Sequence, residues 1–88
     1  RAAEQDWKTT LTEFAFNHDL GAVTYEVEGE GPDHQRVFTA HAFVASRDTE
    51  VGQGVGTSKK HAENAAAADA VARLSGEKRV DEQGEKRD

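Results

Sequence analysis

The residues best suited to chemistry stand where a predicted helix begins. Ser58, Lys59 and Lys60 open an alanine-rich segment, which predicts a helix from about Ser58 to Leu74, since alanine favours helix and serine caps helix N-termini. Each cation in a first turn opposes the helix dipole and costs roughly 0.3–1 kcal/mol. A bound phosphate would reverse that penalty by accepting bonds from the free backbone N–H groups. The turn is therefore predicted to bind phosphate, and lysines that bend into solvent are the alternative.

Other chemistries find little support in the residue inventory. The chain has no cysteine, which excludes disulfides, thiolate metal sites and cysteine nucleophiles. None of the four histidines lies three or four residues from another, so no helix offers a histidine pair to a metal. His41 is expected on the solvent side of a strand. The glycine-rich stretch 52–59 lacks the residue order of a nucleotide-binding P-loop. We therefore expect no catalytic residue, metal or cofactor in this chain.

Two helices and three strands are expected to position the lysine turn. Apolar residues at helical spacing predict a first helix over about 6–20. Its buried face should carry Trp7, Leu11, Phe14, Ala15 and His18. Alternating apolar residues predict strands over 23–28 and 35–45, with a short third strand over 50–55. Short connections favour an antiparallel meander. The predicted fold is α+β, in the order α-β-β-β-α, with a three-stranded antiparallel sheet and both helices packed on one face.

Size and charge narrow the class of protein. The chain of 88 residues can hold one small domain, which we place at 6–74, between a polar linker over 1–5 and a disordered charged tail over 75–88. Because it starts at Arg1 and has no methionine, we expect it to be a segment of a longer protein. No apolar run approaches the roughly 20 residues that span a bilayer, so no membrane partner is expected. The net charge of −6 argues at first sight against a nucleic-acid partner.

Three motifs carry a resemblance to a known family. They are DWKTTLTE over 6–13, GPDH over 31–34 with Phe38 behind it, and GVGTSKKHAENAAA over 54–67. Across about residues 6–74 the chain resembles a double-stranded RNA-binding domain, and more narrowly the C-terminal domain of bacterial ribonuclease III. Each motif alone is a weak signal, whereas all three in order and at the right spacing are a strong one.

The resemblance implies how the domain would meet RNA. Members of this family read two successive minor grooves of A-form RNA and the phosphates between them, over roughly 16 base pairs. The first helix and the loop would enter the minor grooves, and the lysine turn would clamp the phosphates. The residues implied are Thr9, Thr12 and Glu13, then Pro32, Asp33 and His34, and finally Ser58, Lys59 and Lys60. Thr12 stands where the family often has glutamine. Glu63 stands where many members have a third basic residue, which should weaken phosphate binding.

Two functions remain open from the sequence. In the first, the chain is the substrate-binding domain of a ribonuclease III that cleaves double-stranded RNA. The resemblance then implies Mg²⁺ in a separate catalytic domain, a bacterial cytoplasmic enzyme of RNA and rRNA processing, an isolated domain that is a monomer, and a parent that can form a homodimer. In the second, the same fold is a protein-interaction module with weak or lost RNA binding, which uses Val37 and Phe43 on the open sheet face. The residue inventory argues against an autonomous enzyme.

Overall fold

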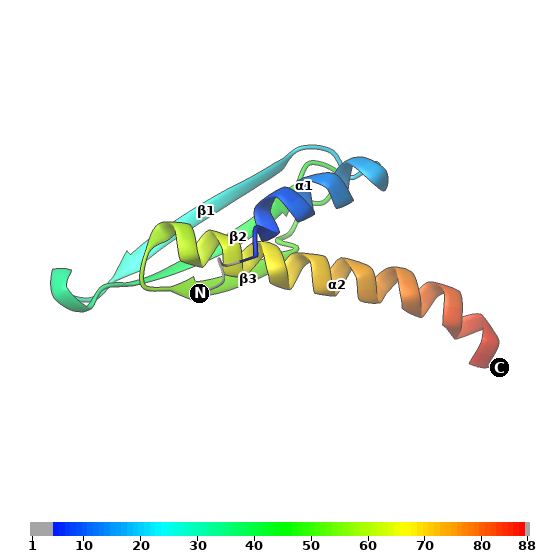
Figure 1. Cartoon of the computed structure of the whole chain (residues 1–88). Helices are drawn as coiled ribbons and strands as arrows, with labels where there is room; N and C mark the ends of the chain where they lie inside the picture. Colours follow the sequence, from blue (N-terminus) through cyan, green and yellow to red (C-terminus); the bar gives the residue numbers. More distant parts are fainter. Residues whose placement is uncertain (1–4, 88) are drawn as a thin grey trace.

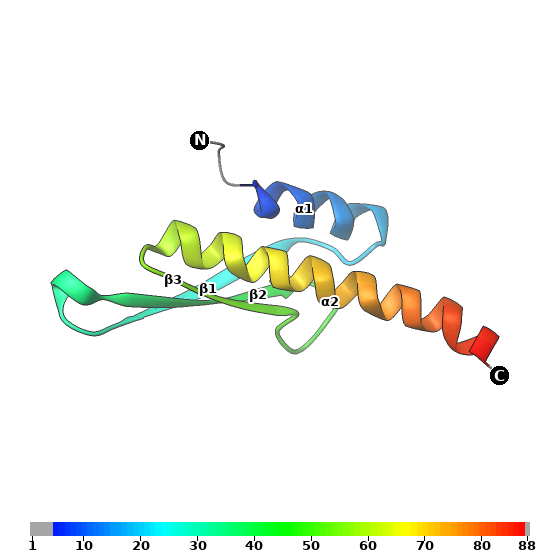
Figure 2. The ribbon, with the colours of Figure 1, turned by 60° about the horizontal axis from the view of Figure 1, so that its bottom comes forward.

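The computed structural model describes residues 5–87, with side chains as far as Glu77, and shows two helices against one sheet (Figure 1). The elements are α1 (Trp7–Asn17), β1 (Val23–Glu30), the short 3₁₀ helix η1 (Asp33–Gln35), β2 (Val37–Val44), β3 (Gly52–Gly56) and α2 (Lys59–Arg87). The strands are antiparallel in the order β1-β2-β3. Both helices lie on the same side of the sheet (Figures 1 and 2). The predicted α+β fold and its α-β-β-β-α order are confirmed.

Helix α1 begins where Asp6 caps it. The Asp6 carboxylate accepts hydrogen bonds from the Thr9 hydroxyl at 2.7 Å and from the Thr9 backbone N–H at 3.2 Å. These two bonds hold the pKa of Asp6 below its usual range. Of the predicted apolar face, Leu11 and Ala15 are buried, and Trp7 and Phe14 are half-buried. His18, also predicted for that face, is exposed just beyond the end of the helix, so that part of the prediction is wrong. The helix ends at Asn17, earlier than predicted, because Asp19 adopts a left-handed conformation with φ of 58°.

The strands bury alternate residues, as the sequence pattern predicts. On β2 the inward residues Ala40, Ala42 and Val44 are buried, whereas Phe38 and the inward residues of β1 are only half-buried. The outward residues of β1 are exposed. Small residues dominate the core, so the helices and the sheet can approach closely. The buried core consists of Leu11, Ala15, Ala40, Ala42, Val44, Val51, Ala62, Ala66, Ala67, Ala70 and Leu74.

Glycines on β3 and alanines on α2 bring the strand and the helix into direct backbone contact. A Cβ atom on Gly54 would lie 2.2 Å from the backbone nitrogen of Ala66, and one on Gly52 would lie 2.4 Å from the carbonyl oxygen of the same residue. Both distances are far inside van der Waals contact, so any side chain there would push the helix off the sheet. This close packing fixes the start of α2 relative to the strands. It thereby also fixes the lysine turn, which consists of Ser58, Lys59 and Lys60.

Helix α2 continues beyond its predicted end. The sequence predicts an exit at residues 75–76 and disorder over 75–88, but helical backbone runs on to Arg87, so the predicted helix end is wrong. Arg47 in the β2–β3 connection donates two hydrogen bonds, of 3.0 and 3.2 Å, to the carboxylate of Glu77. This exposed ion pair joins the β2–β3 connection to the helix just past residue 76. Residues 1–4 of the predicted linker and residue 88 of the predicted tail lie outside the described residues, and the division into linker, domain and tail stays a prediction.

His41 on β2 lies between two carboxylates on the open face of the sheet and is only partly exposed to solvent. Its Nδ1 atom is 2.5 Å from the Glu50 carboxylate, and its Nε2 atom is 3.5 Å from that of Glu28. The hydrogen bond to Glu50, helped by the negative charge of both carboxylates, raises the pKa of His41 above its usual value. The predicted solvent-facing position is therefore only partly correct.

We expect this cluster to make stability fall as the pH rises. Because the folded-state pKa of His41 is raised, its contribution is complete below the unfolded-state pKa of about 6.5 and is lost as the pH passes the folded-state value. The urea midpoint of the wild type should fall as the pH is raised from about 6.5. The midpoint of a His41→Gln variant should fall less over the same range. Parallel pH profiles for the two proteins would contradict this role of His41.

Candidate nucleic-acid interface

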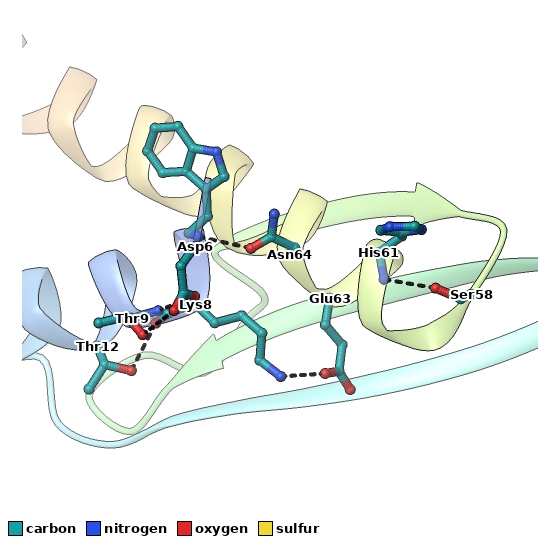
Figure 3. A network of polar contacts seen from close by, with 9 residues as sticks. Asp6, Lys8, Thr9, Thr12, Ser58, His61, Glu63 and Asn64 are labelled. Carbon is teal, nitrogen blue, oxygen red and sulfur yellow. Dashed lines mark hydrogen bonds and ion pairs between the residues drawn. The ribbon is translucent and has the colours of Figure 1, made fainter. Parts of the chain in front are cut away.

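The lysine turn forms the start of α2, and the structure confirms its predicted cap. The Ser58 hydroxyl oxygen accepts a hydrogen bond from the backbone N–H of His61 at 3.1 Å (Figure 3). Lys59 and Lys60 are exposed, and no ion pair holds either of them among the residues with described side chains. The first turn also holds no acidic residue. Two uncommitted ammonium groups therefore stand at the positive end of a long helix, which favours an anionic ligand.

The exposed face of α1 presents mainly hydrogen-bond acceptors. The Thr9 hydroxyl donates to Asp6 at 2.7 Å, and the Thr12 hydroxyl donates to the backbone carbonyl of Lys8 at 3.0 Å. Since each hydroxyl has only one proton, both oxygens can only accept from a partner in this arrangement. Glu13, also exposed, adds a carboxylate. Such a face suits a partner that offers donors, as ribose 2′-hydroxyl groups do.

The β1–β2 connection is a tight, exposed tip. Gly31 adopts a positive φ of 98°, which glycine tolerates, and the Gln35 backbone N–H donates to the carbonyl of Pro32 at 2.9 Å. Asp33 accepts a hydrogen bond from Arg36 at 3.1 Å. The 3₁₀ turn and the extension of β1 to residue 30 were not predicted from the sequence. Together they make the tip a continuation of the hairpin rather than an open loop.

The predicted site residues lie along the molecule and do not surround one pocket. From left to right in Figures 1 and 2 lie the hairpin tip, then the first turn of α2, and then α1 alongside that helix. The acceptors of α1 and the cations of α2 thus belong to neighbouring elements, with the tip projecting beyond both. A row of this kind can contact a long, rigid partner at several separate points.

Asn64 is a structural residue that the sequence analysis missed. Its buried side chain accepts a hydrogen bond from the Trp7 backbone N–H at 2.8 Å (Figure 3). It also donates a hydrogen bond to the Gln5 carbonyl, again at 2.8 Å. These bonds tie the start of α1 to the second turn of α2, and so set the spacing between the two candidate contact segments. In the sequence Asn64 is marked only as a polar residue within an alanine-rich stretch. That pattern does not tell which backbone groups its side chain bonds.

Lys8 and Glu63 form a second bridge that the sequence analysis missed. The Lys8 Nζ atom on α1 is 2.6 Å from the Glu63 carboxylate on α2. In the sequence Glu63 is marked only as a negative charge within the phosphate-binding motif. The structure shows that this charge is paired.

Neither a metal-binding cluster nor a membrane-spanning helix is found among the described residues. No group of three or more histidine, aspartate or glutamate side chains there is placed to hold a metal ion. No helix within the described part of the chain is long and apolar enough to cross a membrane.

The α-β-β-β-α order with its three-stranded antiparallel sheet defines the class of α+β domain to which the chain belongs. A model of the family described as "Double-stranded RNA binding motif" matches residues 7–74. The chain belongs to this family. The resemblance drawn from the three sequence motifs is confirmed.

Curated relatives and solved structures agree with this assignment. Ribonuclease 3 of Mycolicibacterium paratuberculosis is 54% identical over 63 residues, which are 72% of this chain and 26% of that protein. Ribonuclease 3 of Nocardia farcinica is 46% identical over 72 residues, 82% of this chain and 29% of that protein. The chain thus spans little more than a quarter of these relatives.

Among solved structures, Arabidopsis HYL1 superposes with a TM-score of 0.65 at 28% identity, covering 81% of this chain and 99% of that one. A structure of both double-stranded RNA-binding domains of DRB4 gives 0.64 at 30% identity, covering 81% of this chain and 46% of that one. Both structures share the fold of this chain.

Proposed function

We propose that this chain binds double-stranded RNA by its A-form shape and is the substrate-binding domain of a ribonuclease III. The observation that carries the proposal is the lysine turn, where two exposed cations without ion-pair partners among the described residues occupy a capped helix N-terminus. Family membership and the relatives named Ribonuclease 3 support the same conclusion.

Each exposed segment has a role in this proposal. Thr9, Thr12 and Glu13 accept hydrogen bonds from 2′-hydroxyl groups in one minor groove. The tip of Pro32, Asp33 and His34 enters the next minor groove. Ser58, Lys59 and Lys60, with the backbone N–H groups of the α2 N-terminus, bind phosphates across the intervening major groove. The mode of binding is shape-specific because none of these contacts requires a particular base.

The net charge of −6 affects how strongly the domain binds RNA and does not exclude RNA as its partner. Long-range attraction between an acidic domain and RNA is weak, so affinity should be modest. Two phosphate contacts predict at least about a tenfold loss of affinity when salt rises from about 50 to 200 mM. The acidic surface would also disfavour binding to nucleic acid away from the three contact segments.

The parent protein is proposed to be a Mg²⁺-dependent bacterial endoribonuclease. Its metal and catalytic carboxylates would lie in a separate domain, and this chain would supply affinity for the substrate. We further propose that the isolated domain is a monomer, that the parent forms a homodimer, and that the enzyme processes RNA, including rRNA, in the cytoplasm.

A protein-interaction module is the second candidate. Val37 and Val55 are exposed apolar residues on the sheet face that the helices leave open. Phe43, also predicted for this contact, is half-buried. Such groups on an uncovered sheet can mark a protein contact. This function would use that face and would not require the lysine turn.

One titration tests the proposed function. Wild-type protein is mixed with a labelled RNA duplex of about 20 base pairs, long enough for the roughly 16 that the family spans. A DNA duplex of the same sequence and a second RNA duplex of unrelated sequence serve as controls. We expect binding to both RNA duplexes with similar affinity, clearly weaker binding to DNA, and loss of affinity with salt. No binding to RNA at low salt would overturn the proposal and leave the interaction module as the better function.

A further inference from the structure

The Lys8–Glu63 bridge lies between the candidate contact segments. Figure 3 shows the Lys8 side chain extending from α1 to Glu63 on α2, with Thr9 and Thr12 on one side of it and Ser58 on the other. Glu63 follows Lys59 by four residues, so both project from the same face of α2. The bridge therefore sits where a duplex that contacted both helices would cross from one to the other.

The surroundings of Lys8 hold its ammonium group in one place. Besides the 2.6 Å contact with Glu63, the Lys8 Nζ atom lies 5.2 Å from the centre of the Tyr25 ring, within the range of a cation–π contact. Burial, and then the negative charge of Glu63, raise the pKa of Tyr25 to about 12. The phenol is therefore neutral at physiological pH, and its ring supports the cation without adding charge.

The bridge presents its positive end outward. The Lys8 side chain is 40% exposed, against 24% for Glu63. An ammonium group has three N–H donors, and Glu63 is the one hydrogen-bond acceptor shown for it among the residues whose side chains the structure describes. An approaching anion therefore meets the lysine before the glutamate, and meets donors that remain available.

We propose that Lys8 is a third phosphate-binding cation of the RNA interface and that Glu63 is its positioning residue. The inference rests on the proposed function. The sugar–phosphate backbone separates the minor groove from the major groove of a duplex. A cation that lies between minor-groove contacts on α1 and a phosphate clamp on α2 therefore faces that backbone. From the sequence, Glu63 was expected to weaken phosphate binding. In this proposal it instead holds the ammonium group of Lys8, on the neighbouring helix, in position to bind a phosphate.

Salt dependence separates a phosphate contact from a merely structural ion pair. We would measure affinity for a 20-base-pair RNA duplex at several salt concentrations, and thermal midpoints by circular dichroism, for the wild type, Lys8→Gln, Glu63→Gln and the double variant. Arg73→Gln is the matched control, because Arg73 also pairs with a carboxylate, that of Asp69 at 2.8 Å, and is similarly exposed. It lies fourteen residues beyond Lys59 on α2, roughly 21 Å along the helix axis.

We expect Lys8→Gln to bind about five- to tenfold more weakly at low salt and to lower the slope of log K against log salt by about 0.9, the value for one phosphate contact. Arg73→Gln should leave the slope unchanged. When Glu63 is already replaced by glutamine, Lys8→Gln should weaken RNA binding only about twofold. Without Glu63 the lysine is not held in place, so ordering it on a phosphate costs side-chain entropy and its contact contributes less to affinity.

Two results would overturn the inference without touching the proposed function. An unchanged slope for Lys8→Gln, with wild-type binding intact, would leave the bridge with a structural role only. Equal losses from Lys8→Gln in both backgrounds would remove the positioning role of Glu63. Failure of the wild type to bind RNA would instead overturn the proposed function itself.

Discussion

Replacing both Lys59 and Lys60 by alanine will weaken binding to double-stranded RNA about 100-fold at low salt while leaving the domain as stable as before, or more stable. A hydrogen bond to a charged group is worth roughly 1.5–3 kcal/mol, so losing two lysine–phosphate contacts removes about 3 kcal/mol of binding free energy. The slope of log K against log salt should fall by about 2. Both lysines are exposed, so no buried partner is left behind.

The stability half of this prediction follows from the helix dipole. The first turn of α2 contains no acidic residue, so both cations oppose the dipole at roughly 0.3–1 kcal/mol each. Alanine removes that penalty and has the highest helix propensity. A variant that binds worse and unfolds at a higher temperature would show that the lysines are kept for a ligand.

A charge-matched control excludes a general electrostatic effect. The double variant Arg47→Gln and Arg73→Gln also removes two positive charges, but both arginines lie away from the lysine turn, paired with Glu77 and Asp69. We expect its salt slope to equal that of the wild type. Equal losses of affinity from the two double variants would mean that net charge alone, and not a phosphate clamp, drives binding. Unchanged RNA binding by the lysine variant would also contradict the prediction.

The fold could be predicted because local patterns agree with tertiary structure over most of the chain. The alternation along residues 37–44 matches the burial of β2, and the apolar face led by Leu11 is the face that α1 buries. The Asp6 and Ser58 caps could be predicted because each bonds a backbone N–H only three residues away. The candidate site residues were found by motif, and their contacts with RNA stay predictions.

Several of the missed features depend on partners that are distant in sequence. Asn64 bonds the chain at residues 5 and 7, and Lys8 pairs with a residue 55 positions later. No local pattern marks such pairs. The predicted exit at 75–76 failed for a related reason, since serine and glycine are weak breakers and Arg47 bonds Glu77 beyond them. Glycine disfavours a helix interior by only about 1 kcal/mol relative to alanine, so Gly76 does not have to end the helix.

The largest loss of stability is expected from Gly54→Ala. The new Cβ atom would lie 2.2 Å from the backbone nitrogen of Ala66 and 2.5 Å from the carbonyl carbon of Ala65. Because both neighbours are backbone atoms inside a helix, no side-chain rotation can relieve the overlap, and α2 must move off β3. Overpacking costs typically 1–3 kcal/mol, and we expect at least about 3 kcal/mol here, which would lower the thermal midpoint by roughly 12–24 °C in a domain of this size.

Gly76→Ala is the control, because it makes the same change where nothing lies within 4 Å of the new Cβ atom. In a helix interior that change should stabilise by about 0.5–1 kcal/mol. The thermal melt of Gly54→Ala therefore tests the close packing of α2 on β3. That of Gly76→Ala tests whether the helix continues past residue 74. A Gly54→Ala protein that melts with the wild type would contradict the close packing that holds the lysine turn in place. A destabilised Gly54→Ala that still binds RNA well below its melting temperature would show that α2 can shift on the sheet without losing the contacts made by its first turn.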